Sequence, residues 1–452
     1  MNLILNAKIN DSNNLYNIYY TDIIENIVLS SEDETKLVDN IIDIDGKILI
    51  PGAIDSHVHF NDPGFTEQED FSTGTLSAAY GGITTIIDMP CTSLPPVTSV
   101  NNLENKLNIV KEKAVIDFAF WGGINGANQI NDSMLQQLKR LKKRGITAFK
   151  IYTISGMPTY QALSYEKIDK LFKLTQNEDF IFAFHAEDLN IIENSVNKLS
   201  DEEKKTIKGY LLSRPVEAEV IAIKKIIKLA QKYNTQIHIV HISSQKGLKL
   251  VEEYNNATAE TCPHYLEFTE DDLYTLKGRL KTAPVVKALE DKLYLRKSVI
   301  NGKINFITTD HAGTNYEKNK LNNNFSKVYN GIPGTQFMLP YLFSSFYNKK
   351  EINLKRIIEI TSENPAKRYG LYPKKGSLII NTDADFTIME QFEYFVNETM
   401  LMSKGKYSPF NNQKFSYRVN KTILRGKTIF DIENNIKTNY GYGNFIKSKE
   451  KI

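Results

Sequence analysis

Cysteine is nearly absent from this sequence, and no run of apolar residues is long enough to cross a membrane. Cys91 and Cys262 lie far apart and outside any CxxC pattern, which excludes a disulfide framework and a thiolate zinc site. No window approaches the roughly 18 consecutive apolar residues of a membrane helix, and no basic leader with an apolar core opens the chain. We therefore expect an untargeted protein of a reducing compartment, the cytoplasm.

An excess of charge of one sign is also missing. The 56 Lys and Arg residues stand against 53 Asp and Glu residues, which leaves a net charge of +3. This balance gives no reason to expect a nucleic acid or an anionic membrane as a partner. With 41% hydrophobic residues over 452 positions, the chain can bury a large core. We expect a folded globular protein that acts on a small molecule.

The middle of the chain alternates short β-branched and aromatic segments with longer segments of helical periodicity, which is typical of parallel βα units. Helices are expected between the strands, for example over 102–113, 133–143, 216–233 and 287–300. The candidate strands are 47–54, 83–88, 115–120, 147–152, 180–184, 236–240, 258–262 and 304–308. Eight such units favour a closed (β/α)8 TIM barrel. A doubly wound open sheet is the alternative, because strand number alone does not establish closure.

The two ends of the chain differ from its middle. Residues 1–50 and 370–452 contain short alternating segments and turns, and strands are expected at 377–380, 386–389 and 422–425. Because the termini of a domain often lie close together, both ends are predicted to form one small β-sandwich domain. The TIM barrel is then expected over residues 51–369.

The most informative motif is His57-Val58-His59, which follows the first candidate strand. Side chains alternate along an extended chain, so two histidines separated by one residue point to the same side and can reach one metal ion. A single pair of this kind is a weak signal, because two incidental histidines explain it equally well. The motif needs support from elsewhere in the chain.

Three further metal-binding side chains stand where other barrel strands are predicted to end. His185 and His241 come directly after the strands 180–184 and 236–240, and Asp310 follows the last strand. Active sites of TIM barrels are built from these strand ends. Imidazole and carboxylate ligands suit zinc or a similar divalent ion. Each residue alone can be an ordinary core residue, but the five together predict a metal site.

Lys150 is unusual because it lies inside an otherwise apolar strand, in Phe149-Lys150-Ile151. A bare ammonium group is costly to bury without a partner. One solution is reaction of the amine with carbon dioxide, which gives a carbamate that can bridge two metal ions. From the sequence alone, a lysine that faces outward or lies at the end of the strand is at least as good an explanation.

Taken together, these residues resemble the cyclic-amide hydrolases of the amidohydrolase superfamily, a group that includes dihydroorotases, allantoinases, hydantoinases and dihydropyrimidinases. The resemblance covers nearly the whole chain. Its motifs here are Asp55-x-His57-x-His59, Gly81-Gly82-Ile83-Thr84-Thr85, Phe149-Lys150, His185-Ala186-Glu187-Asp188, Ser213-Arg214-Pro215, His238-Ile239-Val240-His241, Glu260-Thr261-Cys262-Pro263-His264-Tyr265, Thr309-Asp310-His311 and Asn364-Pro365-Ala366.

The resemblance implies two divalent metal ions, zinc in the first place, with manganese, iron or cobalt as alternatives. It implies that His57 and His59 hold one ion with Asp310. His185 and His241 would hold the second ion, and carboxylated Lys150 would bridge both. A hydroxide held between the ions would attack the amide, with Asp310 as general base. Because histidines must be neutral to bind metal, activity should fall at acid pH.

Departures from the family pattern bear on the substrate. Dihydroorotases usually carry Arg two residues after the H-x-H pair and Asn in a Met-Pro-Asn-Thr segment, where this chain has Asn61 and Cys91. Since arginine is the natural partner of a carboxylate, its absence argues against dihydroorotate. Hydantoinases and dihydropyrimidinases generally have Tyr five residues after the bridging lysine. Ser155 in this chain argues against them, less strongly.

Allantoinases resemble the chain more closely, so ring opening of allantoin to allantoate is the predicted reaction. The matching segments are His59-Phe60-Asn61-Asp62-Pro63-Gly64, Phe118-Ala119-Phe120-Trp121-Gly122-Gly123, Ser155-Gly156 and Tyr210-Leu211-Leu212-Ser213-Arg214-Pro215. Gln68-Glu69-Asp70 and Thr282-Ala283-Pro284 depart from that group's usual pattern. A related cyclic ureide, or a hydantoinase-, dihydropyrimidinase- or dihydroorotase-like activity, is therefore the alternative.

The resemblance also indicates substrate contacts at four positions and an assembly of several subunits. The expected contacts are Asn61, Ser155, Thr282 and Asn330. A homodimer or homotetramer is expected by analogy alone. A non-catalytic scaffold on the same fold is the distant alternative, since fold does not imply function, and the complete set of ligand residues argues against it.

Overall fold

The computed structural model describes residues 1–34, 37–146, 148–434 and 439–448. Thr147, where one strand was expected to begin, lies outside these residues.

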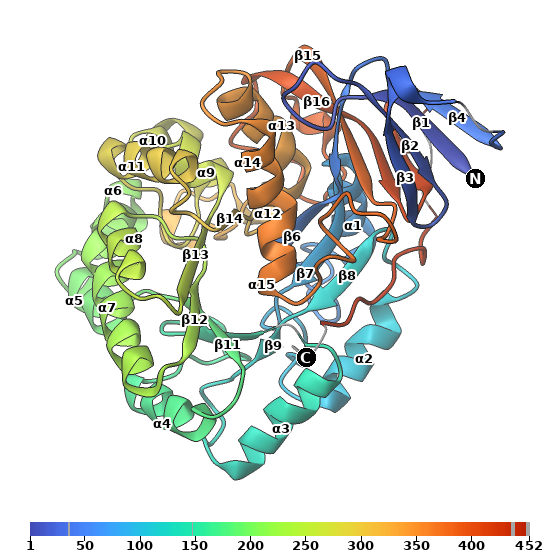
Figure 1. The fold of residues 1–452 in the computed structure, drawn as a ribbon. Helices are drawn as coiled ribbons and strands as arrows, with labels where there is room; N and C mark the ends of the chain where they lie inside the picture. The colour runs from blue at the N-terminus through green and yellow to red at the C-terminus, as the bar shows by residue number, and fades with distance from the viewer. Residues whose placement is uncertain (35–36, 147, 435–438, 449–452) are drawn as a thin grey trace.

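Eight parallel strands form a closed barrel in the middle of the chain (Figure 1). They are β6 (Ala53–Val58), β7 (Ile83–Asp88), β8 (Asp117–Phe120) continued by β9 (Gly122–Gly123), β10 (Phe149–Tyr152), β11 (Ile181–His185), β12 (Gln236–Ile239), β13 (Ala257–Thr261) and β14 (Phe306–Ile307). A parallel bridge between Val58 and His311 joins the end of the first strand to the last. The predicted TIM barrel is confirmed, and the open sheet is excluded.

Helices surround the barrel on its outer side, as Figure 1 shows. They are α1 (Phe71–Tyr80), α2 (Val100–Val110), α3 (Asp132–Lys143), α4 (Tyr165–Thr175), α5 (Leu189–Asn197), α6 (Ile207–Ser213), α7 (Val216–Tyr233), α8 (Gln245–Glu252), α9 (Pro263–Glu267), α10 (Asp272–Leu276), α11 (Leu289–Ile300), α12 (Tyr316–Asn319), α13 (Met338–Leu342), α14 (Leu354–Ile358) and α15 (Asn364–Arg368). The predicted helix over 102–113 begins two residues earlier, because the Ser99 side chain accepts a hydrogen bond from the Asn102 amide and so caps it.

Strands from both ends of the chain form two stacked sheets. The first contains β1 (Asn2–Ala7), β2 (Tyr16–Tyr20), β3 (Ile24–Leu29) and β4 (Asn40–Asp43); the second contains β5 (Ile48–Pro51), β15 (Phe386–Phe395), β16 (Lys414–Leu424) and β17 (Lys427–Asp431). Ile18, Leu49 and Phe386 pack in the core between them. In Figure 1 the blue strands β1–β4 and the orange-red strands β15 and β16 accordingly lie side by side. The predicted β-sandwich is confirmed.

Two predicted strands are wrong in detail. The segment 47–54 is two strands, since β5 pairs antiparallel with β15 and β6 belongs to the barrel. Gly52 separates them: its amide donates to the Asp385 carbonyl, and a Cβ there would lie 2.1 Å from the Thr84 hydroxyl. The segment 377–380 is not a strand, because the Thr382 amide turns back to the Ile379 carbonyl.

A buried cluster of charges joins the barrel to the sandwich. The Lys375 ammonium lies 2.5 Å from Asp117 at the start of β8, 2.8 Å from Asp383 and 2.7 Å from Asp385. Arg425 also pairs with Asp117. Lys374 lies 3.4 Å from Asp383 at the exposed side of the cluster. The three carboxylates thus share three cations, and Lys375 fills the space between them, so this acidic group is a structural ion-pair cluster.

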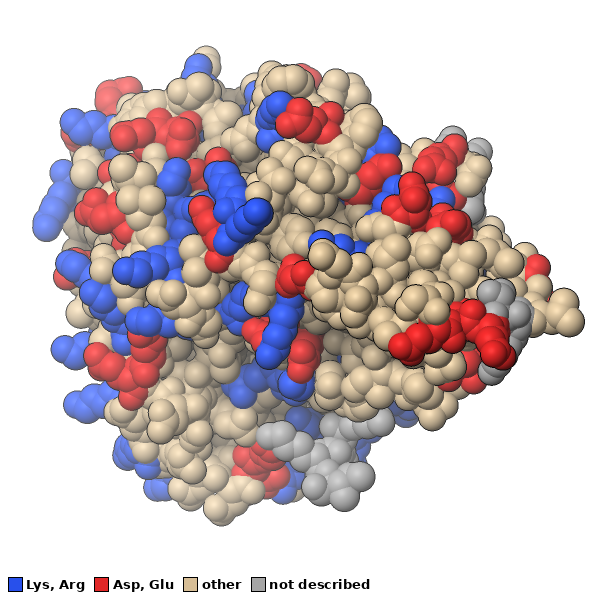
Figure 2. Space-filling model, turned by 45° about the horizontal axis from the view of Figure 1, so that its top comes forward, with Lys and Arg blue, Asp and Glu red and all other residues tan. Residues whose placement is uncertain are grey.

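The surface carries charges of both signs. On the face shown in Figure 2, basic and acidic side chains are interspersed, in keeping with the net charge of +3. Among the described helices, none is both long and apolar enough to cross a membrane.

Candidate metal centre

His57 and His59 lie at the end of β6 and face Asp310 at the end of β14. The Nε2 atom of each imidazole is 3.2 Å from Oδ1 of Asp310. The other ring nitrogen of His57, Nδ1, donates to Glu260 at 2.5 Å, because a carboxylate only accepts. In neutral His57 the Nε2 lone pair is then directed at a carboxylate oxygen. Two acceptors face each other in this way only when a cation or a proton lies between them.

His185 and His241 form a second pair of facing ligand atoms. Nε2 of His185 is 2.9 Å from Glu187, which leaves Nδ1 only 3.1 Å from Nε2 of His241. Burial lowers the pKa of His185, and burial with the neighbouring His185 holds the pKa of His241 well below its usual value. Both rings are therefore neutral near pH 7, the form in which imidazole binds metal.

Lys150 lies between the two groups of ligands on β10. It is completely buried, and its amine has no hydrogen-bond partner among the described residues. Burial lowers the pKa of Lys150 to about 8, although the neighbouring Cys91 and Asp310 act in the opposite direction. The outward-facing lysine is thereby excluded, and an appreciable fraction of the amine is uncharged near neutral pH.

The backbone is strained at some of the strand ends that carry these side chains. His241 and Asp310 have φ angles of 39° and 49°, and Asn61 has a φ of 55°. Residues other than glycine rarely adopt this left-handed conformation, and they keep it where surrounding contacts hold them. Here it turns the chain sharply at the end of the strand, so that the side chains of His241 and Asp310 face the centre.

A cavity of about 400 Å³ opens above these residues. Its lining includes His59, His185, His241 and Asp310, together with the segment 154–157 and the segment 328–331. It is thus bounded by the side chains of the candidate metal centre below and by loop residues at its mouth, the usual form of a small-molecule site at the C-terminal face of a barrel.

The four expected substrate contacts occupy different places around this cavity. Ser155 and Asn330 line it, whereas Asn61 and Thr282 are buried outside its lining. The Ser155 hydroxyl donates to the Tyr160 carbonyl and so holds its own loop. The Thr282 hydroxyl donates to a backbone carbonyl, and both side-chain amide atoms of Asn61 lack a partner in the described chain.

Several residues at the site received no role from the sequence. Glu260 and Glu187 fix the orientation of the ligand histidines, and Arg214 pairs with Glu187 while it lines the cavity. Tyr152 lines the wall, where its ring stacks on His185. Glu260 could have been singled out from the sequence, because it is an acidic residue inside a predicted barrel strand.

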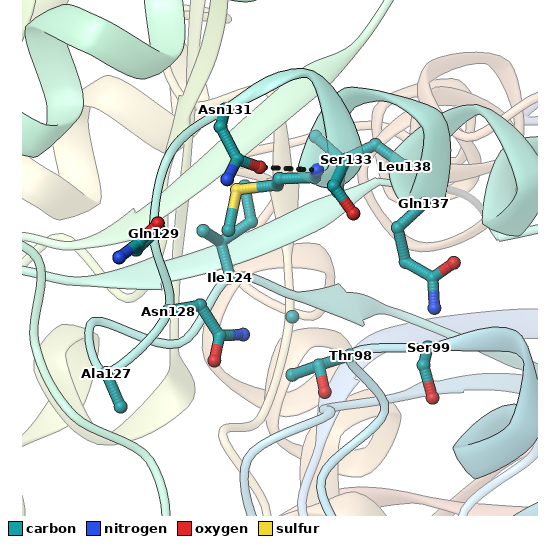
Figure 3. A pocket seen from close by; sticks show the side chains of 12 residues that line it. Thr98, Ser99, Ile124, Ala127, Asn128, Gln129, Asn131, Ser133, Gln137 and Leu138 are labelled. Carbon is teal, nitrogen blue, oxygen red and sulfur yellow. Dashed lines mark hydrogen bonds between the residues drawn. The ribbon is translucent and has the colours of Figure 1, made fainter.

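A second, larger cavity lies away from this chemistry. Figure 3 shows it between the loop that follows β9, the residues just before α2 and the first turns of α3. Its volume is about 550 Å³. Its labelled side chains, among them Thr98, Asn128 and Gln137, are uncharged. None of its described lining residues is a titratable group, so unlike the smaller cavity it offers no ligand for a metal ion.

Comparison with known proteins agrees with this geometry. Residues 48–429 match the model of the Amidohydrolase family. The chain belongs to the amidohydrolase family. This amidohydrolase is 34% identical to an allantoinase of Rubrobacter xylanophilus, over 82% of the chain and 81% of that relative. It is also 32% identical to a dihydroorotase of Methanosphaera stadtmanae, over 91% of the chain and 92% of that relative.

Solved structures share the whole architecture of the amidohydrolase. The L-hydantoinase (dihydropyrimidinase) from Arthrobacter aurescens superposes with a TM-score of 0.91 and 27% identity, over 99% of both chains. The predicted family and enzyme class, a hydrolase of the cyclic-amide group, are thereby confirmed. The family is metal-dependent, and the described chain has a matching cluster in His57, His59 and Asp310.

Proposed function

We propose that this amidohydrolase opens the ring of a neutral cyclic ureide, with allantoin as its substrate, at a centre of two divalent metal ions. The observation that carries the proposal is the arrangement of ligand atoms. His57 and His59 direct nitrogens at the Asp310 carboxylate, His185 and His241 direct nitrogens at each other, and Lys150 has no partner between them.

The donor set fits two ions better than one. His57, His59 and Asp310 bring their ligand atoms within 4.8 Å of one another and would hold the first ion. His185 and His241 would hold the second. Nitrogen and oxygen ligands suit zinc, with manganese, iron and cobalt as alternatives. Carboxylated Lys150 would bridge the ions and remove the unpaired buried amine.

The chemistry then divides between the ions and the protein. When bound, divalent ions lower the pKa of a water molecule and polarise the scissile carbonyl. The Asp310 carboxylate takes the proton released during attack and returns it to the leaving ring nitrogen. Burial acts to raise the pKa of Asp310, but His57, His59 and His241 together hold it well below the usual range, so the carboxylate is ionised and ready to accept.

The cavity favours a substrate without a carboxylate. Arg214 is the only Lys or Arg in its described lining, and its guanidinium is already paired with Glu187. A dihydroorotate carboxylate would therefore find no free cation, and an arginine fork is the partner it needs. This observation supports a neutral ureide over dihydroorotate, while hydantoin and dihydropyrimidine rings remain the alternatives within the same chemistry.

A panel of substrates and metals tests the proposal. Purified protein loaded with zinc, manganese, iron or cobalt is assayed with allantoin, hydantoin, dihydrouracil and dihydroorotate. We expect ring opening of allantoin with at least one metal and two metal equivalents per chain by elemental analysis. Absence of ring opening throughout the panel would contradict the proposal and favour the scaffold alternative. Preference for another ring would show that the proposed substrate is wrong and leave the proposed reaction unchanged.

Carboxylation of Lys150 has its own test. Carbon-13 carbonate added to metal-loaded protein should give a carbamate signal that is lost in Lys150→Ala. A Lys150 amine that stays unmodified in active, metal-loaded protein would sink this part of the proposal.

We further propose a homodimer or homotetramer in the cytoplasm, with the sandwich formed by residues 1–50 and 370–452 and the barrel by 51–369. Native mass and cell fractionation test the first two points.

A further inference from the structure

Two buried lysines lie directly behind the loop at the mouth of the cavity. Lys281 and Lys320 are only 1% and 2% exposed. No carboxylate of the described chain pairs with either of them. Their ammonium groups instead contact carbonyl oxygens, and most of these belong to the segment 325–331, which includes residues that line the substrate cavity.

Each ammonium group has three backbone acceptors. Nζ of Lys281 lies 2.6 Å from the Phe325 carbonyl, 2.6 Å from the Val328 carbonyl and 3.4 Å from the Ser326 carbonyl. Only the ammonium form has three N–H donors for such a set. Burial, with the neighbouring Arg214, lowers the pKa of Lys281 to about 7.

Lys320 makes a similar set of contacts at the end of α12. Its Nζ lies 2.8 Å from the Tyr329 carbonyl, 2.8 Å from the Gly331 carbonyl and 3.4 Å from the Lys281 carbonyl. The two lysines are therefore connected through one backbone carbonyl. Five carbonyls of the segment 325–331 are turned toward the two Nζ groups. Burial, with the neighbouring Lys281, holds the pKa of Lys320 well below the usual lysine value.

Because peptide bonds are planar, the contacts of the two lysines also determine the directions of the backbone N–H and C=O of Asn330. In a trans peptide the C=O and the following N–H point in opposite directions. The Tyr329 carbonyl points to Lys320, so the N–H of Asn330 points away from the lysines. The Gly331 amide donates to the Lys281 carbonyl at 2.9 Å, so the C=O of Asn330 also points away from them.

Asn330 thus presents a free donor and a free acceptor. Its residue lines the cavity, and neither its backbone N–H nor its C=O has a hydrogen-bond partner among the described residues. The Tyr210 hydroxyl holds its side chain from the other side, at 3.0 Å from Oδ1. An amide within a ring offers the matching C=O and N–H at adjacent positions.

We propose that Lys281 and Lys320 are positioning residues: the hydrogen bonds from their Nζ groups to the carbonyls on both sides of Asn330 fix the direction of its N–H and C=O, at a position where the family resemblance implies a substrate contact. The inference rests on the proposed function for the identity of the bound group. The orientation of the loop itself does not depend on that function.

The test compares Lys320→Met and Lys281→Met with Lys327→Met, an exposed lysine of the same loop. Hydrogen exchange of the segment 325–331 in metal-loaded protein without substrate should be faster in the first two variants and unchanged in the control. With the ring that the native enzyme opens, KM should rise by about tenfold while kcat stays within about threefold, since ground-state and transition-state binding are lost equally.

Chemical rescue separates a positioning role from a general loss of structure. In Lys320→Ala, propylammonium should occupy the vacated space, donate to the carbonyls and lower KM again, whereas tetramethylammonium, which has no N–H donor, should not. Lys320→Gln, which keeps an N–H donor, replaces Lys320→Met if that protein does not fold.

Two outcomes would overturn the inference: unchanged exchange and unchanged KM in both folded lysine variants, or a KM that rises without rescue by propylammonium. If the native enzyme opens none of the rings, the proposed function fails, and the exchange measurement still decides whether the lysines hold the loop.

Discussion

At the scale of single residues, hydrogen-bond partners decide which ring nitrogen each histidine can offer to a metal. Glu260 occupies Nδ1 of His57, and Glu187 occupies Nε2 of His185. One histidine therefore presents Nε2 and the other Nδ1. The sequence could predict which side chains meet, because strand ends converge in a barrel. It could not predict these tautomers, because they depend on residues from other strands.

Replacement of Asp310 by Asn removes the proposed proton acceptor while it keeps the size of the side chain. We expect kcat to fall by roughly 10²- to 10⁴-fold, the range of general-base catalysis. The assay is run with metal content measured on the same sample, and the circular dichroism spectrum serves as the control for folding. A variant with native kcat at full metal loading would exclude Asp310 as the base.

His264 predicts a pH dependence of stability. Burial lowers its pKa to about 4 from an ordinary 6.5. Between pH 6.5 and 4 the unfolded chain binds a proton that the folded chain does not, so stability is complete above pH 6.5 and falls with pH across this window. The contribution is up to about 3 kcal/mol, from 1.36 kcal/mol for each pKa unit.

Urea unfolding of metal-depleted protein measures this contribution. The free energy of unfolding should decrease less steeply between pH 6.5 and 4 in His264→Gln than in the native protein. Equal slopes for the two proteins would show that His264 is accessible to protons in the folded state.

At the scale of secondary structure, β13 contributes to the metal centre without providing a ligand. Its Glu260 is completely buried and reaches both His57 and His238. These histidines, His57 above all, hold the pKa of Glu260 near 2 against the effect of burial. The strand thus places a charged carboxylate behind the ligands, which raises the basicity of a metal-binding imidazole.

Glu260→Gln should weaken metal binding by roughly 10- to 100-fold, as is typical of such supporting carboxylates. The amide keeps an acceptor oxygen but loses the negative charge. Competition with a chelator measures the affinity, and Glu253→Gln, at an exposed position after α8, is the matched control. Equal affinities in both variants would mean that Glu260 serves packing alone.

The boundaries of elements show what the sequence could and could not predict. The helix α7 coincides with its expected range, because its apolar face repeats over five turns and Asn234 ends it in a left-handed conformation. The run 47–54 was less informative. Its apolar residues are continuous, and the strand pairing, in which β5 joins β15 and β6 joins β7, shows that two sheets share it.

At the scale of the whole molecule, the ion-pair cluster around Lys375 joins the sandwich to the barrel. Its ammonium is buried among carboxylates from both domains, and they raise its pKa above the ordinary lysine value despite burial. Removal of one partner from a buried ion pair leaves charge without compensation, which costs more than the pair itself contributes.

Lys375→Met should therefore lower the free energy of unfolding by roughly 3–5 kcal/mol. Lys374→Met changes the adjacent, exposed lysine and should have little effect. Denaturant unfolding of both variants measures the difference. A loss below about 1 kcal/mol in Lys375→Met would mean that the cluster stabilises the fold no more than a surface ion pair does.

The shared sandwich also sets an order for folding during synthesis. Strand β5 leaves the ribosome among the first residues, yet its partner β15 follows more than three hundred residues later. Its neighbour β6 carries His57 and can join the barrel before the sandwich is complete. The apolar residues of the N-terminal strands must therefore wait, exposed or protected by chaperones, until the last strands emerge. A chain that stops before β15 would be released with an unpaired edge on β5, which other chains could pair with and which chaperones and proteases could recognise.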